Sequence, residues 1–167
     1  MKTSYLSRLA ALTAFLAAAL TQAAEPTHKD KSFVTDAAEG GLAEVRMGEL
    51  AKTKAQSPAA KELGEMLITD HTKANDELKQ IASGKGIEVP ADPSLVQQAK
   101  LKLLESKDGA KFDQAFAEEA VSDHEKDIKA FEKAAKELDD ADLKAFAAKM
   151  LPTLRAHLAH AKKAQAK

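Results

Sequence analysis

The chain has 167 residues, 44% hydrophobic and 31% charged, which suits one globular domain with a core of its own. Its formal net charge of −1 argues against a nucleic-acid partner, since affinity for phosphates depends mainly on cationic side chains. The absence of cysteine excludes disulfides and a lipid-modified cysteine, and an aromatic content of 4% is typical of a helical bundle rather than a sheet protein.

The first residues have the pattern of a secretory signal peptide. Lys2 and Arg8 precede an apolar run over residues 9–20, and small residues at Ala23 and Ala24 offer a cleavage site. The run is short for a membrane span, so a membrane anchor is the less favoured alternative. We therefore expect residues 1–23 to be removed and the mature protein to be periplasmic, without an integral membrane span.

After the cleavage site we expect a flexible segment over residues 24–29 and one domain over residues 30–165. Apolar residues at helical spacing predict a first helix over residues 30–56, with Glu44 inside its apolar arc. Gly40, Gly41 and Gly48 lie around that glutamate. A helical glycine costs about 1 kcal/mol relative to alanine, so we expect a close helix contact or open space beside the carboxylate.

A second helix follows after a tight turn. Ser57 is a suitable N-cap for a helix that starts with proline and covers residues 58–83, with His71 on its apolar face. The next stretch, residues 87–107, contains a predicted short helix over residues 94–105. It is long enough to run the length of a bundle and so to join two parallel helices.

Two further long helices complete the predicted domain. One covers residues 109–138 with His124 in the middle of its apolar arc, and the last ends near Ala164 with His157 in its arc. The sequence thus predicts an all-α protein, a ferritin-like four-helix bundle with one long crossover that contains a short extra helix.

Four polar residues are expected to meet in the middle of this bundle. Reflecting each helix pair about its turn places Glu44 at the depth of His71, and His124 within one turn of His157. One glutamate and three histidines are the ligand types of zinc, iron, manganese or copper. The alternative is a buried hydrogen-bonded network that fixes the packing of the helices.

The dipeptide Asp-His occurs twice and adds a carboxylate near two of the imidazoles. Asp70 and Asp123 each lie about 100° from the following histidine on the helix, where they could act as further ligands or as partners of an imidazole from a neighbouring helix. His160, one turn after His157, is expected at the surface. His28 falls in the predicted flexible segment and is assigned no role.

Known catalytic patterns are missing from the chain. Di-iron carboxylate bundles carry Glu-x-x-His on two helices, whereas Ile68, Val121 and Leu154 stand three residues before the three inward histidines. The serines do not lie in a strand-turn-helix elbow of the hydrolase type. We therefore do not expect an enzyme.

Several segments resemble one bacterial family. They are the pattern F-x-x-x-A-A-x-G-G-x-A-E-V over residues 33–45, ITDH over 68–71, the FD pair at 112–113 and LPTLRAHL over 151–158. Together they are similar to the family catalogued as domain of unknown function 4142, over nearly the whole mature chain. The resemblance implies a ferritin-like fold and export, and members are often labelled predicted outer membrane proteins. It brings no established activity and no accepted site residues.

Two classes of function remain open. The first is an exported, non-enzymatic helical-bundle protein with an envelope or stress-related role. The alternative is a periplasmic protein that binds one transition metal ion (Zn, Fe, Mn or Cu) through Glu44, His71, His124 and His157. Nucleic acid is not an expected partner, and the sequence indicates no particular protein partner.

Overall fold

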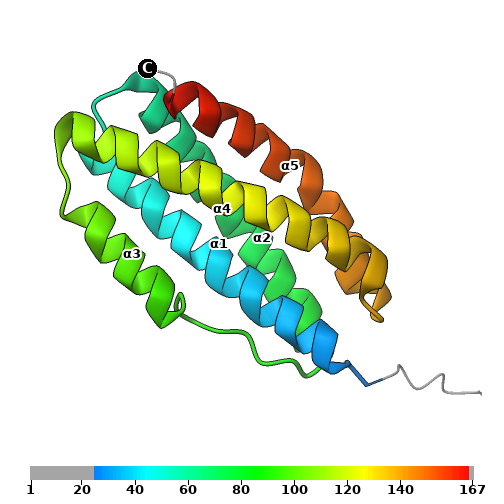
Figure 1. Ribbon diagram of the computed structural model, residues 1–167. Coiled ribbons are helices and arrows are strands. Elements are labelled where there is room, and N and C mark those ends of the chain that lie inside the picture. Colours follow the sequence, from blue (N-terminus) through cyan, green and yellow to red (C-terminus); the bar gives the residue numbers. More distant parts are fainter. Residues whose placement is uncertain (1–24, 166–167) are drawn as a thin grey trace, which may run out of the picture.

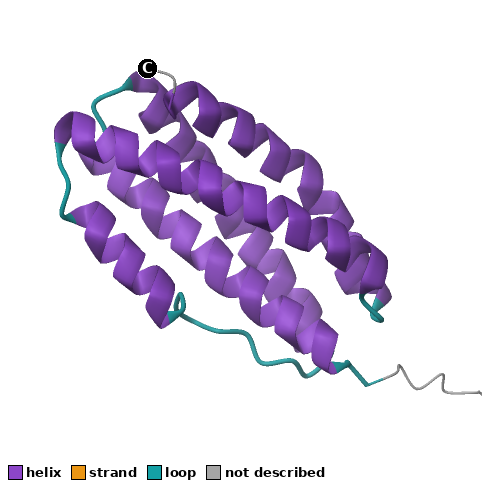
Figure 2. Ribbon diagram, in the orientation of Figure 1, coloured by secondary structure: helices purple, strands orange, loops and turns teal. Residues whose placement is uncertain are grey.

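The computed structural model describes residues 25–165, and this part of the chain consists of five helices without a strand (Figures 1 and 2). The helices are α1 (His28–Lys54), α2 (Pro58–Ser83), α3 (Leu95–Glu105), α4 (Gly109–Glu137) and α5 (Ala141–Gln165). The predicted all-α class is confirmed. The predicted signal peptide lies outside the described residues.

The four long helices form a bundle of two antiparallel hairpins (Figure 1). Helix α1 pairs with α2 and α4 pairs with α5, while α2 packs on α5 and α1 packs on α4. Helices α2 and α4 run in the same direction and are joined by the long connection that contains α3, which lies against α1 and α4. The predicted bundle with one long crossover is therefore confirmed.

The starts of α2 and α3 follow from local capping. Ser57 Oγ accepts a hydrogen bond from the backbone N–H of Ala60, and Pro58 occupies the first helical position, where its missing N–H has no consequence. Ser94 and Gln97 form a reciprocal capping box at α3. Both helices therefore begin where the sequence predicts them.

Helix α1 begins earlier than predicted. Thr27 is its N-cap and forms a capping box with Asp30, so that His28, predicted to lie in a flexible segment, is the first residue of the helix. The sequence interpretation placed the start at Asp30 because the apolar spacing begins there. The Thr-x-x-Asp pattern is the signal that locates the true start.

Each hairpin holds the turn of the other hairpin through one aspartate. Asp30 Oδ1 accepts hydrogen bonds from the backbone N–H groups of Asp139 and Asp140, both at 3.2 Å, in the turn between α4 and α5. At the opposite end of the bundle, Asp113 of α4 accepts a hydrogen bond of 2.7 Å from the backbone N–H of Ser57, between α1 and α2. These hydrogen bonds fix the position of one hairpin along the other at both ends of the bundle.

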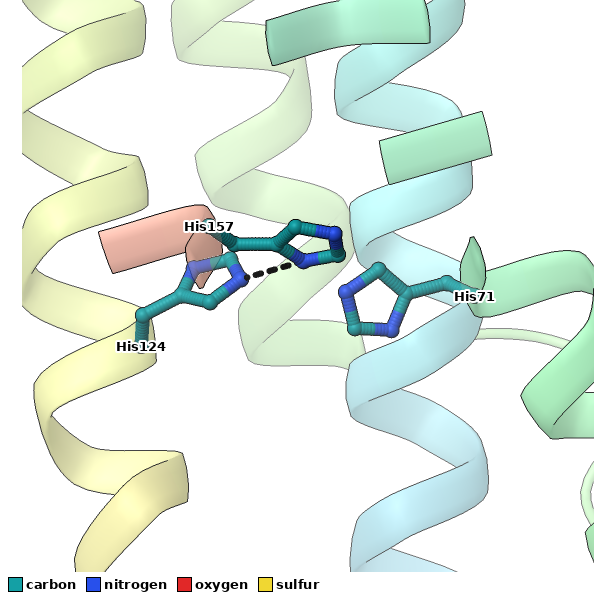
Figure 3. Close-up of side chains that lie close together, drawn as sticks. All are labelled: His71, His124 and His157. Carbon is teal, nitrogen blue, oxygen red and sulfur yellow. Dashed lines mark hydrogen bonds between the residues drawn. The ribbon is translucent and has the colours of Figure 1, made fainter. Parts of the chain in front are cut away.

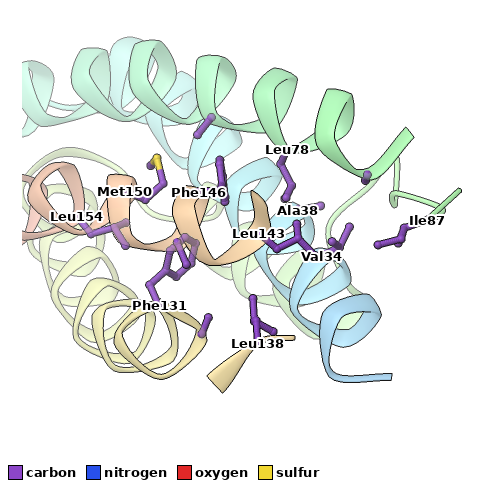
Figure 4. Close-up of a cluster of buried hydrophobic side chains, with 14 residues drawn as sticks. Val34, Ala38, Leu78, Ile87, Phe131, Leu138, Leu143, Phe146, Met150 and Leu154 are labelled. Atoms are coloured by element: carbon purple, nitrogen blue, oxygen red, sulfur yellow. The ribbon is translucent and has the colours of Figure 1, made fainter. Parts of the chain in front are cut away.

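Two apolar clusters fill the bundle, one on each side of its middle. The cluster near the start of α1 is shown in Figure 4, and its larger members are Val34, Leu78, Ile87, Phe131, Leu138, Leu143, Phe146, Met150 and Leu154. The cluster near the turn between α1 and α2 includes Met47, Leu63, Leu67, Leu104, Phe112 and Phe116. The layer between them contains polar side chains.

Helices α1 and α2 approach closely at two glycines. A Cβ atom on Gly48 would lie 2.5 Å from the carbonyl oxygen of Gly64, and one on Gly64 would lie 2.8 Å from the Cβ of Ala51. Such distances are too short for any side chain at Gly48. The close helix contact expected from the helical glycines is therefore present at Gly48.

Candidate metal centre

The structure brings all four predicted residues into one layer in the middle of the bundle. Glu44 comes from α1, His71 from α2, His124 from α4 and His157 from α5, so each long helix contributes one side chain. All four are buried, at no more than 4% exposure. Equal depth follows from the short turns of the two hairpins, because the two residues of each hairpin lie at similar distances along the chain from the turn.

The three imidazole rings converge (Figure 3). Their centroids are 5.2–5.8 Å apart, and one ligand nitrogen from each ring lies within 4.8 Å of the other two. The shortest approach joins His124 Nε2 and His157 Nδ1 at 3.2 Å. These nitrogens are close enough to share one proton or one ion.

The outward nitrogens of two rings are held by acceptors. His124 Nδ1 donates to the carbonyl oxygen of Ala120 at 2.9 Å, and His157 Nε2 donates to Asp70 Oδ2 at 2.9 Å. A neutral imidazole has one N–H group, and its second nitrogen carries a lone pair. Because the outward nitrogens donate, the lone pairs are on the inward nitrogens, His124 Nε2 and His157 Nδ1. Burial lowers the pKa of both histidines, which favours these neutral forms. Two lone pairs consequently face each other across 3.2 Å.

The carboxyl group of Glu44 lies between the rings of His71 and His124. Its Oε2 is 3.0 Å from His71 Nε2 and its Oε1 is 3.2 Å from His124 Nδ1. Within the described residues, the angles leave Glu44 Oε1 and His71 Nε2 without a hydrogen-bond partner. An unpaired buried polar atom costs about 1–3 kcal/mol, so these two atoms favour either a proton on Glu44 or a bound cation.

Burial also changes the pKa of this pair. It raises the pKa of Glu44 to about 7, against the opposing attraction of His124, and it lowers the pKa of His71 to about 4. Both shifts favour uncharged side chains in the absence of a cation. A bound cation would reverse the shift at Glu44 and leave His71 neutral, the form in which an imidazole is a ligand.

Sequence reasoning missed one carboxylate of this layer, Asp127. It is half-buried and lines the same pocket as Glu44 and His71. Burial, and next the repulsion from Glu44, raise the pKa of Asp127 to about 8. The signal was its position three residues after His124, which places both on one face of α4.

The two aspartates of the Asp-His pairs have different positions. Asp70 reaches across to His157 on α5, as a partner from a neighbouring helix. Asp123 is turned toward α3, where its Oδ1 lies 3.3 Å from Lys100 Nζ, and none of its hydrogen bonds goes to an imidazole. The expectation that Asp123 supports a histidine is therefore not met. The position of α3, which supplies the lysine, decides this.

The remaining histidines lie outside the centre. His160 is one third exposed, and its Nδ1 lies 3.8 Å from Glu62 Oε1 near the surface. His28 is exposed at the start of α1. Neither contributes a nitrogen to the layer formed by the three inward histidines.

The chain belongs to the family of the domain of unknown function (DUF4142), whose family model matches residues 16–164. The resemblance found in the sequence is thus confirmed. No curated protein sequence matches the chain. Among the five helices of residues 25–165, none is sufficiently long and apolar to span a membrane.

A solved structure has the same fold. It is described as CopM in the Cu(II)-bound form, and it superposes with a TM-score of 0.69 over 81% of this chain and 95% of its own. The two sequences are 18% identical. At this identity the comparison establishes the shared helical-bundle fold.

Proposed function

We propose that this protein binds one transition metal ion, Cu(II) foremost, at the centre formed by Glu44, His71, His124 and His157. The observation that carries the proposal is the contact between His124 Nε2 and His157 Nδ1, two lone-pair nitrogens 3.2 Å apart. Neutral groups that face each other in this way repel unless a proton or a metal ion lies between them. An ion between the three imidazoles, whose ligand nitrogens lie within 4.8 Å of one another, would replace this repulsion by coordination, and Glu44 Oε2 beside His71 Nε2 is the candidate fourth ligand.

The distances suit adjacent ligands of one ion. Two atoms that are each about 2.0–2.1 Å from an ion lie about 2.8–3.4 Å apart for angles between 90° and the tetrahedral value. The 3.2 Å between His124 Nε2 and His157 Nδ1 and the 3.0 Å between His71 Nε2 and Glu44 Oε2 both fall in this range. Each of the two contacts therefore has the spacing of two neighbouring ligands of a metal ion.

The outward hydrogen bonds have the pattern of metal-bound histidines. Such a histidine donates its other N–H to a carbonyl or carboxylate, which fixes the ring and selects the free nitrogen. His124 donates to the carbonyl of Ala120, and His157 donates to Asp70. This support exists in the folded protein before an ion is present.

The choice of copper rests on two arguments. Cu(II) forms the most stable complexes among the divalent first-row metals with nitrogen and oxygen ligands. CopM, which shares the fold, is described in a Cu(II)-bound form. Zinc is the closest competitor, since three histidines and a carboxylate also suit a tetrahedral ion.

A second function remains supported by the pKa of Glu44. With a pKa near 7, this carboxyl is partly protonated at neutral pH and can donate a hydrogen bond toward His71 Nε2, 3.0 Å away. In that case the layer is a structural network in a non-enzymatic envelope or stress-related protein. It would bind no metal, so the two functions are separable by experiment.

The proposed place of action is the periplasm. The support is the sequence of residues 1–24, with Lys2 and Arg8 before a short apolar run and small residues at its end. Mass spectrometry of protein recovered from the periplasm should give a mass that begins after Ala23 or Ala24. A mass that retains Met1 would refute export with cleavage.

Calorimetric titration of chelator-treated protein without a His-tag tests the metal centre. We expect one equivalent of Cu(II) to bind to the wild type, and binding to weaken strongly in Glu44→Gln and His124→Ala. His160→Ala is the matched control, since it removes a histidine from the surface. Electron paramagnetic resonance should show nitrogen couplings from the imidazoles. Equal binding in wild type and both centre variants would place the ion elsewhere.

A further inference from the structure

A pocket leads from the surface to the candidate centre. It is narrow, with about 30 Å³ that a water-sized group can occupy, and lies between α1, α2, α4 and α5. Its outer lining includes the exposed Asp36, and its inner lining includes the buried Glu44 and His71. Between these ends it is lined by Asn75 and Asp127. The pocket therefore connects solvent with two of the four groups of the centre.

We propose that this pocket is the access passage by which the metal ion reaches the centre, with Asn75 as its gate and Asp127 as the carboxylate that draws the cation inward. The proposal rests on the proposed function and adds the route and the residues that control it. Neither residue is one of the four groups of the centre.

The position of Asn75 supports its role as a gate. A Cβ atom on Gly41 would overlap Asn75 Oδ1, so the amide lies directly on the glycine backbone of α1. Gly41 is one turn from Glu44 on α1, and Asn75 is one turn from His71 on α2. The amide thus lies across the passage one turn outside the ligands. A short side chain in such a place can rotate aside, and its oxygen can contact a passing cation.

The charges along the pocket favour a cation. Its acidic lining residues are Asp36, Asp127 and Glu44, and no lysine or arginine contributes. Burial raises the pKa of Glu44 and of Asp127, and an approaching cation reverses both shifts and leaves the two carboxylates charged. The remaining walls are largely apolar, and acidic groups in a narrow apolar cleft concentrate cations and raise their rate of association. Asp127 occupies the middle of this series, one turn along α4 from His124.

The other sides of the centre are less suited to passage. Apolar clusters close the bundle on both sides of the layer along its axis. On the side of α3, Lys100 lies against Glu119 and Asp123, and the pocket that these three residues line is lined by none of the four groups of the centre. The pocket at Asn75, by contrast, is lined by Glu44 and His71 of the centre.

Stopped-flow loading and release of Cu(II) test the route. A metallochromic chelator gives the signal, because the described residues contain neither Tyr nor Trp. Asn75→Ala should load and release the ion several-fold faster with Kd unchanged, since a gate alters the barrier in both directions. Asp127→Asn should slow loading by about tenfold while release stays near the wild-type rate, so Kd weakens by the same factor.

Two further variants make the result specific. Asp123→Asn removes a carboxylate one turn away on the same helix but outside the pocket, and it should leave the rates as in the wild type. Asp36→Asn alters the exposed rim, where folding is not at risk, and should slow loading in low salt. Thermal melting of each apo variant shows that the fold is retained.

The outcomes separate this proposal from the proposed function. If the wild type binds no stoichiometric metal, the proposed function fails and the route fails with it. If the metal binds and its rates are unchanged in Asn75→Ala and Asp127→Asn, the centre stands and the route is overturned. A weakened Kd with faster release alone in Asp127→Asn makes Asp127 a ligand and also overturns the route.

Discussion

Asp70 of α2 accepts a hydrogen bond of 2.9 Å from Nε2 of His157 on α5, across the interface between the two hairpins. Through this contact the partly exposed carboxylate of Asp70 fixes the buried imidazole of His157. It determines which nitrogen of His157 faces the other two histidines. The orientation of the His157 ring in the centre therefore depends on Asp70, which lies at the edge of the centre.

Replacing Asp70 by asparagine should weaken metal binding without unfolding the protein. The amide lacks the charge that stabilises the N–H of His157, and loss of such a partner typically lowers metal affinity about 10–100-fold. Calorimetric titration with Cu(II) measures the effect. Asp76→Asn, an exposed change on the same helix, is the control. Wild-type affinity in Asp70→Asn would show that this hydrogen bond does not tune the centre.

The stability of the metal-free protein should depend on pH through Glu44. Its pKa rises from 4.5 unfolded to about 7 folded, so the folded state keeps a proton that the unfolded chain releases. This contribution is complete below about pH 4.5 and is lost as pH rises through 7. Denaturant unfolding of wild type and Glu44→Gln should therefore show the variant gaining relative stability over this window, on the scale of about 1.4 kcal/mol per pKa unit.

His71 should act with the opposite sign. Burial lowers its pKa from 6.5 to about 4, so its contribution is complete above pH 6.5 and is lost as pH falls through 4. The same denaturation series on His71→Gln should lack this acid-side loss. An identical pH profile in wild type and variant would contradict the burial of a neutral imidazole.

Two glycines of α1 should respond to alanine in opposite directions. Gly48→Ala places a Cβ 2.5 Å from the Gly64 carbonyl and should destabilise the bundle by about 1–3 kcal/mol through overpacking. Gly40→Ala meets only the end of Gln97 at 4.0 Å and should stabilise it by about 0.5–1 kcal/mol. Thermal melting compares them. Equal effects would mean that helix propensity rather than helix contact decides.

Core packing predicts a clear contrast between two leucines. Leu67 is fully buried beside the centre, so Leu67→Ala should cost about 2–5 kcal/mol of unfolding free energy. Leu103 of α3 is 63% exposed, and Leu103→Ala should change stability by less than about 0.5 kcal/mol. Urea unfolding gives both values. A large loss at Leu103 would indicate an additional contact of α3 in solution.

The features that depend on local chemistry could be predicted from the sequence. The start of α2 follows from Ser57 and Pro58, and the shared depth of Glu44 and His71 follows from helix periodicity and the short turn between their helices. The same holds for His124 and His157. Periodicity and turn position are properties of neighbouring residues, so the fold and the four inward groups did not require tertiary knowledge.

The features that were missed depend on contacts between distant segments. Asp123 pairs with Lys100 because α3 passes along α4, and the sequence indicates the length of the crossover but not its side. Asp127 becomes important because Gly41 and Asn75 leave a pocket beside it. The early start of α1 is different, since Thr27 carried a local signal that apolar spacing alone overlooked.

The aspartates that reach from one hairpin to the turn of the other have a consequence for folding cooperativity. Neither hairpin can open at its turn without breaking hydrogen bonds to Asp30 or Asp113 of its neighbour. Burial raises the pKa of Asp30, but the hydrogen bonds from Thr27 and from the turn lower it further than burial raises it. The Asp30 carboxylate therefore stays charged. Amide hydrogen exchange should therefore show the four long helices opening as one unit rather than as two separate hairpins.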